Sequence, residues 1–268
     1  VFVQKLKNDG VKGLVVRYPW KQVEPTQGNY NYTRIKNHLN LVQSKGLKMI
    51  VFIDDKSFSG VAAVPGYIKN NSNYTYINIT GGVSATRWNP FVKSRFISLW
   101  TNMGANLDDH PALEGVVYSE TSASIPSGTV TVPAYDPVVN KQVIIDTLTA
   151  QSNAFPKSNV FWMMNYFTNG HHDGVFLGNS VVDTYIGDIA DTVLPLGVIM
   201  GGPDILPEDT GLVNRSYPYY TEFNNKGMKL FGSAQNDSFR HLHDGNTSLP
   251  FYNMQQIFSY AKNQLHVN

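Results

Sequence analysis

The stretch KGLVVRYPWKQVEPTQGNYNYTRIKNHLNLVQSKGLKMIVFIDD, residues 12–55, decides the fold. Its first part, residues 12–18, is a mostly apolar run of the length that predicts a buried strand. Residues 32–45 repeat apolar side chains at helical spacing and end before Gly46, a helix stop signal. Residues 47–53 are a second apolar run. A strand, a helix and another strand in this order predict a parallel βαβ unit.

The same alternation continues to the end of the chain. Further strands are predicted at 113–119, 159–164, 196–200 and 228–234, and helices at 90–107, 137–154, 179–191 and 250–264, with 218–226 helical or irregular. Long loops are predicted at 56–88 and 121–136, where Gly, Asn, Ser, Thr and Pro are frequent. This pattern indicates an α/β protein with a parallel sheet.

A (β/α)8 barrel of the TIM type is the expected architecture, with residues 1–268 as one domain, because such barrels need about 250 residues. A barrel has eight strands and the pattern yields six, so we expect one strand before Val1 and one after Asn268. An open, doubly wound sheet is the alternative. It is disfavoured because no Gly-x-Gly-x-x-Gly or Walker-type loop follows any strand, so no nucleotide cofactor is predicted.

The composition narrows the classes of function. Hydrophobic residues make up 42% of the chain, which is enough for a large core, yet no apolar run approaches the ~20 residues of a membrane helix. The net charge is +1, so neither nucleic acid nor a membrane surface is an expected partner. Only 15% of residues are charged and 12% are aromatic, a profile that suits a sugar ligand. The absence of cysteine excludes disulfides and thiolate chemistry, and fits an exported bacterial or viral protein.

The carboxyl ends of the predicted strands are rich in carboxylates and amides. In barrels the reacting groups lie at these ends. The residues found there are Arg17, Trp20, Asp54, Asp55, Ser119, Glu120, Asn165, Tyr166, Asp204, Gln235, Asn236 and Asp237. No serine–histidine pairing stands out. The run His171-His172-Asp173 has no evident third ligand, so no metal is predicted.

Glu120 is the first candidate, because it follows an apolar strand and precedes a loop of small residues. A second carboxylate across the barrel mouth would complete a glycosidase pair, in which one group protonates the leaving oxygen and the other attacks or activates water. Asp237 and Asp204 are the candidates by position. Either aspartate could instead cap a helix, so the choice stays open.

Two blocks of the chain carry signatures. Residues 15–25 (VVRYPWKQVEP) join an arginine, a tryptophan and a Glu-Pro pair, and residues 28–32 (GNYNY) open the helix that follows. Residues 88–90 (WNP) open the next helix, and residues 110–120 (HPALEGVVYSE) end in glutamate. In order and spacing these blocks resemble clan A glycoside hydrolases, which are (β/α)8 barrels and include family 42 β-galactosidases and family 5 enzymes. The resemblance covers residues 12–120 and weakens beyond them.

The resemblance implies roles for individual residues. Glu120 falls on the acid/base glutamate, and Ser119 replaces an asparagine that contacts the substrate 2-hydroxyl in the clan. Arg17 falls on an arginine that braces the catalytic carboxylate, while Glu24 belongs to a structural loop signature. The first strand of this chain would be the second strand of the barrel. The clan's glutamate nucleophile on strand seven has no match, and Asp237 is the acid nearest to that position.

The sequence therefore predicts a glycoside hydrolase acting on a polysaccharide or oligosaccharide. The predicted location is secreted or extracellular, and a periplasmic or virion-associated location is the alternative. Glu120 and Asp237 are the expected catalytic residues. The expected substrate-binding residues are Arg17, Trp20, Asp54, Asn165, Tyr166, Asp204 and Gln235. Trp20, Trp88 and Trp162 are candidate stacking platforms.

Two alternatives stay open. A polysaccharide lyase on the same barrel would need a charge-neutralising group and a base, which Arg17, Tyr166, His171 or His172 could supply. A non-catalytic glycan-binding barrel is favoured by the missing nucleophile and disfavoured by Glu120. The lyase forms an ultraviolet-absorbing unsaturated uronide, whereas the hydrolase only gains reducing ends.

Overall fold

The computed structural model describes residues 2–8, 10–125, 135–165, 180–234, 236–239 and 252–267. The chain forms two compact units. The first comprises Val1–Ser119 and Pro126–Val160, and the second comprises Glu120–Ile125 and Phe161–Asn268. The single domain over 1–268 stays a prediction.

Three parallel strands run through the first unit. They are β1 (Gly13–Pro19), β2 (Lys48–Asp54) and β5 (Leu113–Tyr118), in the spatial order β1-β2-β5. The register pairs Arg17 with Phe52, and Phe52 with Val117. Because side chains alternate along a strand, these three residues project from the same face of the sheet. The carboxyl ends of all three strands therefore meet at one edge.

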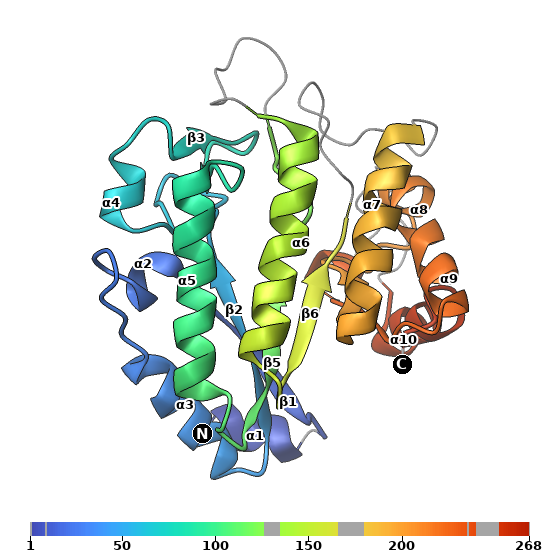
Figure 1. Ribbon diagram of the computed structural model, residues 1–268. Coiled ribbons are helices and arrows are strands. Elements are labelled where there is room, and N and C mark those ends of the chain that lie inside the picture. The colour runs from blue at the N-terminus through green and yellow to red at the C-terminus, as the bar shows by residue number, and fades with distance from the viewer. Residues whose placement is uncertain are drawn as a thin grey trace. The chain divides into compact units, whose positions relative to one another are not determined.

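Helices connect these strands as the sequence predicts. The first unit contains α1 (Phe2–Asn8), α2 (Trp20–Val23), α3 (Thr33–Gln43), α5 (Pro90–Leu107) and α6 (Pro137–Ala154). The helices α5 and α6 lie side by side and cover the strands in Figure 1. Both begin with an N-cap, Asn89 or Asp136, whose side chain accepts from two backbone N–H groups, followed by proline at N1.

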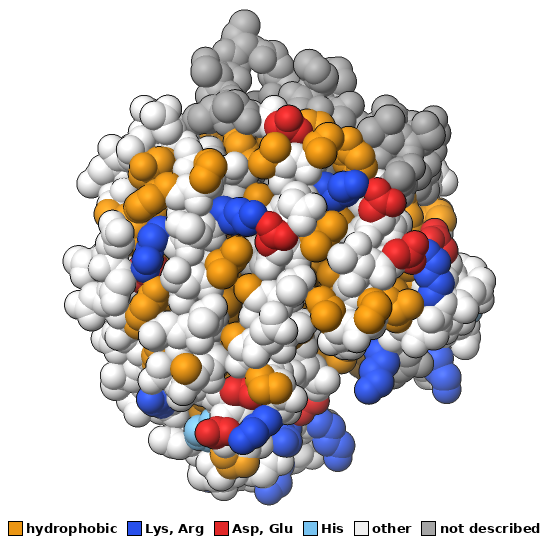
Figure 2. All heavy atoms as spheres, viewed as in Figure 1, with side chains coloured by type: hydrophobic (Ala, Val, Ile, Leu, Met, Phe, Trp, Pro, Cys, Tyr) orange, Lys and Arg blue, Asp and Glu red, His pale blue; other side chains and the backbone are white. Residues whose placement is uncertain are grey.

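The packing of α5 on α6 depends on a glycine. A Cβ at Gly104 would lie 2.2 Å from the carbonyl oxygen of Ala154, so only glycine permits this approach. Lys93 of α5 and Asp146 of α6 form an ion pair across the same helices. In Figure 2 basic and acidic side chains are interspersed over this surface.

The predicted loop at 56–88 contains regular structure, which corrects the prediction. It holds a short helix, α4 (Gly66–Lys69), and an antiparallel hairpin of β3 (Thr75–Ile77) and β4 (Val83–Ala85). Asn78 builds the turn, because its Oδ1 accepts from the backbone N of Thr80 at 3.1 Å and of Gly82 at 3.0 Å. Strands of three residues are too short to show an alternating pattern in the sequence.

The second unit also contains three parallel strands. They are β6 (Asn159–Met163), which begins in the first unit, then β7 (Ile199–Gly202) and β8 (Leu230–Gly232). The helices are α7 (Ser180–Val193), α8 (Thr210–Arg215), α9 (Tyr217–Asn225) and α10 (Met254–Asn263), with 3-10 turns η1 (Leu194–Leu196) and η2 (Asn236–Phe239). The predicted α/β fold with six parallel strands is confirmed.

Among the described residues, no helix is both long enough and apolar enough to cross a membrane.

Candidate active site

A carboxylate and a carboxamide meet in the second unit. Glu120 lies two residues after the end of β5 and is half-buried. Asn165 lies two residues after the end of β6 and is buried. The Nδ2 of Asn165 donates a long hydrogen bond of 3.4 Å to Oε2 of Glu120. Two residues that the sequence assigned separately to the site are therefore in contact.

The Asn165 carboxamide is fixed from several sides. Its Oδ1 accepts from the backbone N of Ser122 at 2.9 Å, and its own backbone N donates to Oγ1 of Thr121 at 3.0 Å. The backbone N of Thr121 in turn donates to the carbonyl oxygen of Met163 in β6, at 3.2 Å. Because Oδ1 already accepts from Ser122, the Nδ2 donor is left for Glu120. The contact places a neutral donor beside one carboxylate oxygen of Glu120.

A buried ion pair lies in the first unit, at the carboxyl ends of β2 and β5. Arg87 donates from Nη2 to Oδ1 of Asp55 at 2.7 Å, and its Nε donates to the other carboxylate oxygen. Ser119 joins them, because Arg87 Nη2 donates to its Oγ and this hydroxyl donates to Oδ1 of Asp55 at 3.2 Å. All three side chains are buried. Ser119 is thus committed to this network and is not free to contact a sugar hydroxyl.

The electrostatics of this network are balanced. Burial alone would raise the pKa of Asp55, but the Arg87 guanidinium, Lys56 and the Ser119 hydroxyl together hold that pKa below its usual value. Arg87 also lies over the ring of Tyr118, with Cζ 5.3 Å from the ring centroid. Burial raises the pKa of Tyr118 to about 12. The carboxylate and guanidinium therefore stay charged together.

Arg17 and Asp54, at the carboxyl ends of β1 and β2, bind each other. Arg17 Nε lies 3.0 and 3.3 Å from the two carboxylate oxygens, and Nη2 lies 2.5 Å from Oδ1. The guanidinium also lies over Phe52, with Cζ 4.2 Å from the ring centroid. The Arg17 side chain is 46% exposed, so a ligand can reach it. The carboxylate that Arg17 braces is Asp54.

Trp20 does not face a ligand, which corrects its predicted role. Its ring is fully buried, and Nε1 donates to Oε2 of Glu24 at 2.8 Å. Glu24 is also fully buried and accepts from the backbone N of Gly28 at 2.8 Å and from Nη2 of Arg95. The Glu-Pro block is therefore structural, as expected. Trp20 lies on the one-turn helix α2, which turns its ring into the core.

The other two candidate stacking platforms are buried as well. Trp162 on β6 is fully buried, and Trp88 is 5% exposed. Trp88 packs against Tyr76, at 5.5 Å between ring centroids, and against Tyr135, at 4.7 Å. These rings belong to the core, so the predicted stacking on Trp88 and Trp162 is wrong.

Several predicted residues are only partly described. Asp204 follows β7 and is half-buried, and its backbone oxygen accepts from the Tyr217 hydroxyl at 3.3 Å. The backbone of Asp237 lies in η2, but its side chain is outside the described residues. Tyr166, Gln235 and the run His171-His172-Asp173 also lie outside them. The described part of the chain holds no group of three or more His, Cys, Asp or Glu suited to a metal ion.

Sequence reasoning missed Arg87 and Thr121. Arg87 lies in the predicted loop at 56–88, one residue before a signature block, and no local pattern marks it as the partner of Asp55. Thr121 follows Glu120, and a small polar residue after a strand-end acid is the only signal that could have indicated a support for Asn165.

Comparisons with known proteins establish the fold. No protein-family model matches the sequence, and no curated protein matches it. The catalytic domain of β-amylase from Paenibacillus polymyxa is similar in structure, with a TM-score of 0.66 at 10% identity, over 98% of this chain and 84% of that one. The β-galactosidases from Rahnella sp. R3 and Bacillus circulans sp. alkalophilus have TM-scores of 0.51 and 0.52 at 9% identity over 78% of this chain.

The chain spans 37% and 38% of the lengths of those two β-galactosidases. At such low identity the likeness concerns the fold alone. The expected TIM-type α/β barrel class is therefore confirmed, and glycoside hydrolases are the proteins that this fold resembles.

Proposed function

We propose that this chain is a glycoside hydrolase in which Glu120 is the general acid. The observation that carries the proposal is the half-buried Glu120 carboxylate just beyond β5, with the fixed Asn165 carboxamide as its donor. Strand ends are where (β/α) barrels hold their reacting groups. The structural likeness to a β-amylase catalytic domain and to β-galactosidases supports the same reaction class.

In this reaction Glu120 gives its proton to the oxygen of the scissile glycosidic bond as the bond to the anomeric carbon breaks. Asn165 donates to one oxygen of this carboxyl group, and its proposed role is to help orient the group. A second carboxylate either attacks the anomeric carbon or removes a proton from the attacking water.

Asp237 is the proposed second carboxylate, and Asp204 is the alternative. Retaining pairs lie ~5–5.5 Å apart and inverting pairs ~6.5–9.5 Å apart. Aspartate is one methylene shorter than the usual glutamate, which favours the wider, inverting geometry. Arg17, Asp54, Tyr166 and Gln235 are proposed to orient the sugar, and the exposure of the paired Arg17 supports its part.

The proposed substrate is a polysaccharide or oligosaccharide, and the proposed place of action is outside the cell. The test incubates the protein with α- and β-linked glucans, galactans and uronate-containing polysaccharides. New reducing ends are expected on one class of substrate, and they should be absent with Glu120→Gln.

The matched control is Glu114→Gln, because Glu114 lies on β5 itself and its Oε1 accepts a hydrogen bond from Asn159 at 3.1 Å. This variant should keep full activity. An ultraviolet-absorbing product would show that the chain is a lyase and not a hydrolase. Glycan binding without any product would show that the chain is a non-catalytic glycan-binding protein.

A further inference from the structure

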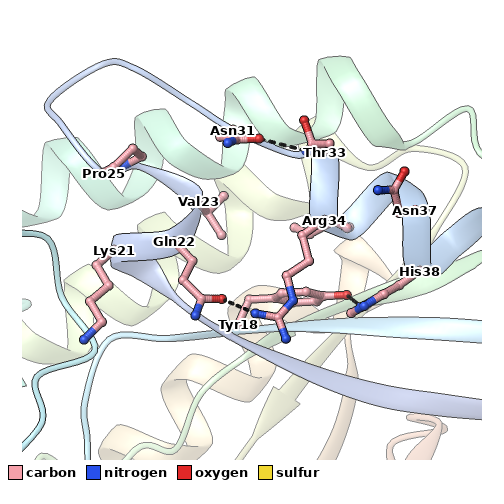
Figure 3. Close-up of a pocket in the computed structure, with 11 residues that line it drawn as sticks. Tyr18, Lys21, Gln22, Val23, Pro25, Asn31, Thr33, Arg34, Asn37 and His38 are labelled. Carbon is pink, nitrogen blue, oxygen red and sulfur yellow. Dashed lines mark hydrogen bonds between the residues drawn. The ribbon is translucent and has the colours of Figure 1, made fainter.

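A cavity of about 540 Å³ lies in the first unit, between the segment that follows β1 and the helix α3. This volume is in the range of small-molecule sites, ~300–1,000 Å³. Its floor is made by the buried residues Tyr18, Val23 and Ile35. Figure 3 shows polar side chains from both segments around it; those that line the cavity are Lys21, Gln22, Asn31, Thr33, Arg34, Asn37 and His38.

The cavity lining carries positive charge without an acidic partner. Arg34 and Lys21 line it, and neither Asp nor Glu does so among the described residues. Toward the described residues, Arg34 uses one N–H, from Nη1 to Oε1 of Gln22 at 3.1 Å, out of the five that a guanidinium offers. The ammonium of Lys21 forms no hydrogen bond or ion pair with the part of the chain that the structure describes. Both cations are available to an anion.

The two other titratable groups of the lining, His38 and Tyr18, add no charge at neutral pH. Partial burial and the nearby Arg34 charge both lower the pKa of His38. Its Nδ1 meets the Tyr18 hydroxyl at 2.7 Å, a contact drawn in Figure 3. Burial raises the pKa of Tyr18 to about 12, so its hydroxyl stays neutral. Tyr18 and His38 therefore form a fixed, uncharged wall beside Arg34.

The rest of the rim presents hydrogen-bonding groups suited to hydroxyls. Oδ1 of Asn31 accepts from the backbone N of Thr33 at 3.0 Å, which fixes the Asn31 amide group. Within the described ranges its Nδ2 donates to no other group. Thr33 and Asn37 are among the polar residues that line the same cavity. A ligand with several hydroxyls and one negative charge matches this lining.

We propose that this cavity binds a uronic-acid residue of a glycan, with its carboxylate on Arg34 and its hydroxyls on the amide rim. A neutral sugar would leave the Arg34 guanidinium without a counter-charge. An inorganic anion would leave the apolar floor and the rim unused. The site goes beyond the proposed hydrolase function, since it contains neither Glu120 nor any other residue assigned to catalysis.

Calorimetric titration with sodium D-glucuronate, D-glucose and inorganic phosphate tests the proposal at low salt. A charge-assisted hydrogen bond distinguishes an anion from its neutral analogue by about tenfold or more. Glucuronate should therefore bind at least about tenfold more tightly than glucose, and also more tightly than phosphate. Equal affinity for glucose would overturn the role of the Arg34 guanidinium. Equal or tighter binding of phosphate would overturn the assignment to a sugar.

The variant Arg34→Gln should weaken glucuronate binding by about tenfold or more, and leave the weak glucose binding unchanged. Lys36→Gln is the matched control, because Lys36 is an exposed cation on the same helix outside the cavity. It should leave the affinity within about twofold, whereas an equal loss would mean only general attraction to a basic surface. Glu120→Gln should bind glucuronate normally, so failure of the catalytic proposal and failure of this one are separate results.

Discussion

Asn165 donates from Nδ2 to Oε2 of Glu120 across 3.4 Å, and its Oδ1 is already bound to the backbone N of Ser122 at 2.9 Å. The carboxamide therefore has only one way to face the carboxylate. A neutral donor in this place orients the carboxyl group without adding a charge. Replacing it by a carboxylate adds a negative charge beside Glu120 and also removes the Nδ2 donor.

Asn165→Asp should move the pH profile of the proposed reaction. A second carboxylate beside Glu120 disfavours its ionised form and raises its pKa. A general acid works only while protonated, so the high-pH limb of kcat should shift to higher pH. Measuring kcat across pH 4 to 9 checks this.

Asn165→Ala is the control for that shift. It removes the donor without adding charge, so kcat should fall by about tenfold while the high-pH limb moves much less than with Asp. Identical profiles for the two variants would mean that Asn165 does not act through Glu120.

Asp55→Asn should destabilise the fold by about 3–5 kcal/mol, because it leaves the buried Arg87 charge without a counter-charge. Denaturant unfolding measures this loss. Asp109→Asn is the contrast, because the Lys157–Asp109 pair is exposed, and its removal should leave the unfolding midpoint unchanged.

The loss caused by Asp55→Asn should also depend on pH. The pKa of Asp55 is lower in the folded protein than in the unfolded chain, so its contribution is present above the unfolded pKa of ~3.9 and is lost as the pH falls through the folded pKa. The difference between wild type and variant should shrink in acid. A constant difference from neutral pH down to full acid unfolding would contradict the ion pair.

Tyr118 should make the protein sensitive to alkali. Its pKa is raised by burial to about 12, against ~10 in an unfolded chain. Its contribution to stability is complete below pH ~10 and is lost as the pH rises through about 12. Tyr118→Phe should flatten this loss between the two values, as measured by unfolding at each pH. An unchanged slope would argue against burial of the hydroxyl.

Gly104→Ala should destabilise the first unit by about 1–3 kcal/mol, because the new methyl group would meet the carbonyl oxygen of Ala154. Gly187→Ala is the matched control for Gly104→Ala, because Gly187 is also a helical glycine, in α7. A Cβ there has no neighbour within 4 Å, so alanine should stabilise by about 0.5–1 kcal/mol. Thermal unfolding of both variants should show shifts of opposite sign, and equal shifts would contradict the close packing of α5 on α6.

Much of the fold could be predicted where a local signal was strong. The helices at 90–107 and 137–154 match α5 and α6 to the residue, because each begins with an Asn or Asp cap followed by proline. The hairpin of β3 and β4 escaped prediction, since its strands have three residues each.

The candidate site shows a similar division. The strand-end rule selected both Glu120 and Asn165, which the structure brings into contact. The same rule misplaced Trp20, because position along the chain does not fix the direction of a ring that turns inward to Glu24. Arg87 reaches Asp55 from a loop 32 residues away, a pairing that only the folded chain defines.

The central claim, that Glu120 is the general acid, is tested most directly by kcat/KM on two glycosides of the same sugar. One has a leaving group that needs protonation, and the other has an activated leaving group that departs as an anion. For Glu120→Gln we predict a loss of about 10²–10⁴ on the first and less than about tenfold on the second. A loss within about threefold on both substrates, or the same large loss on both, would contradict the claim.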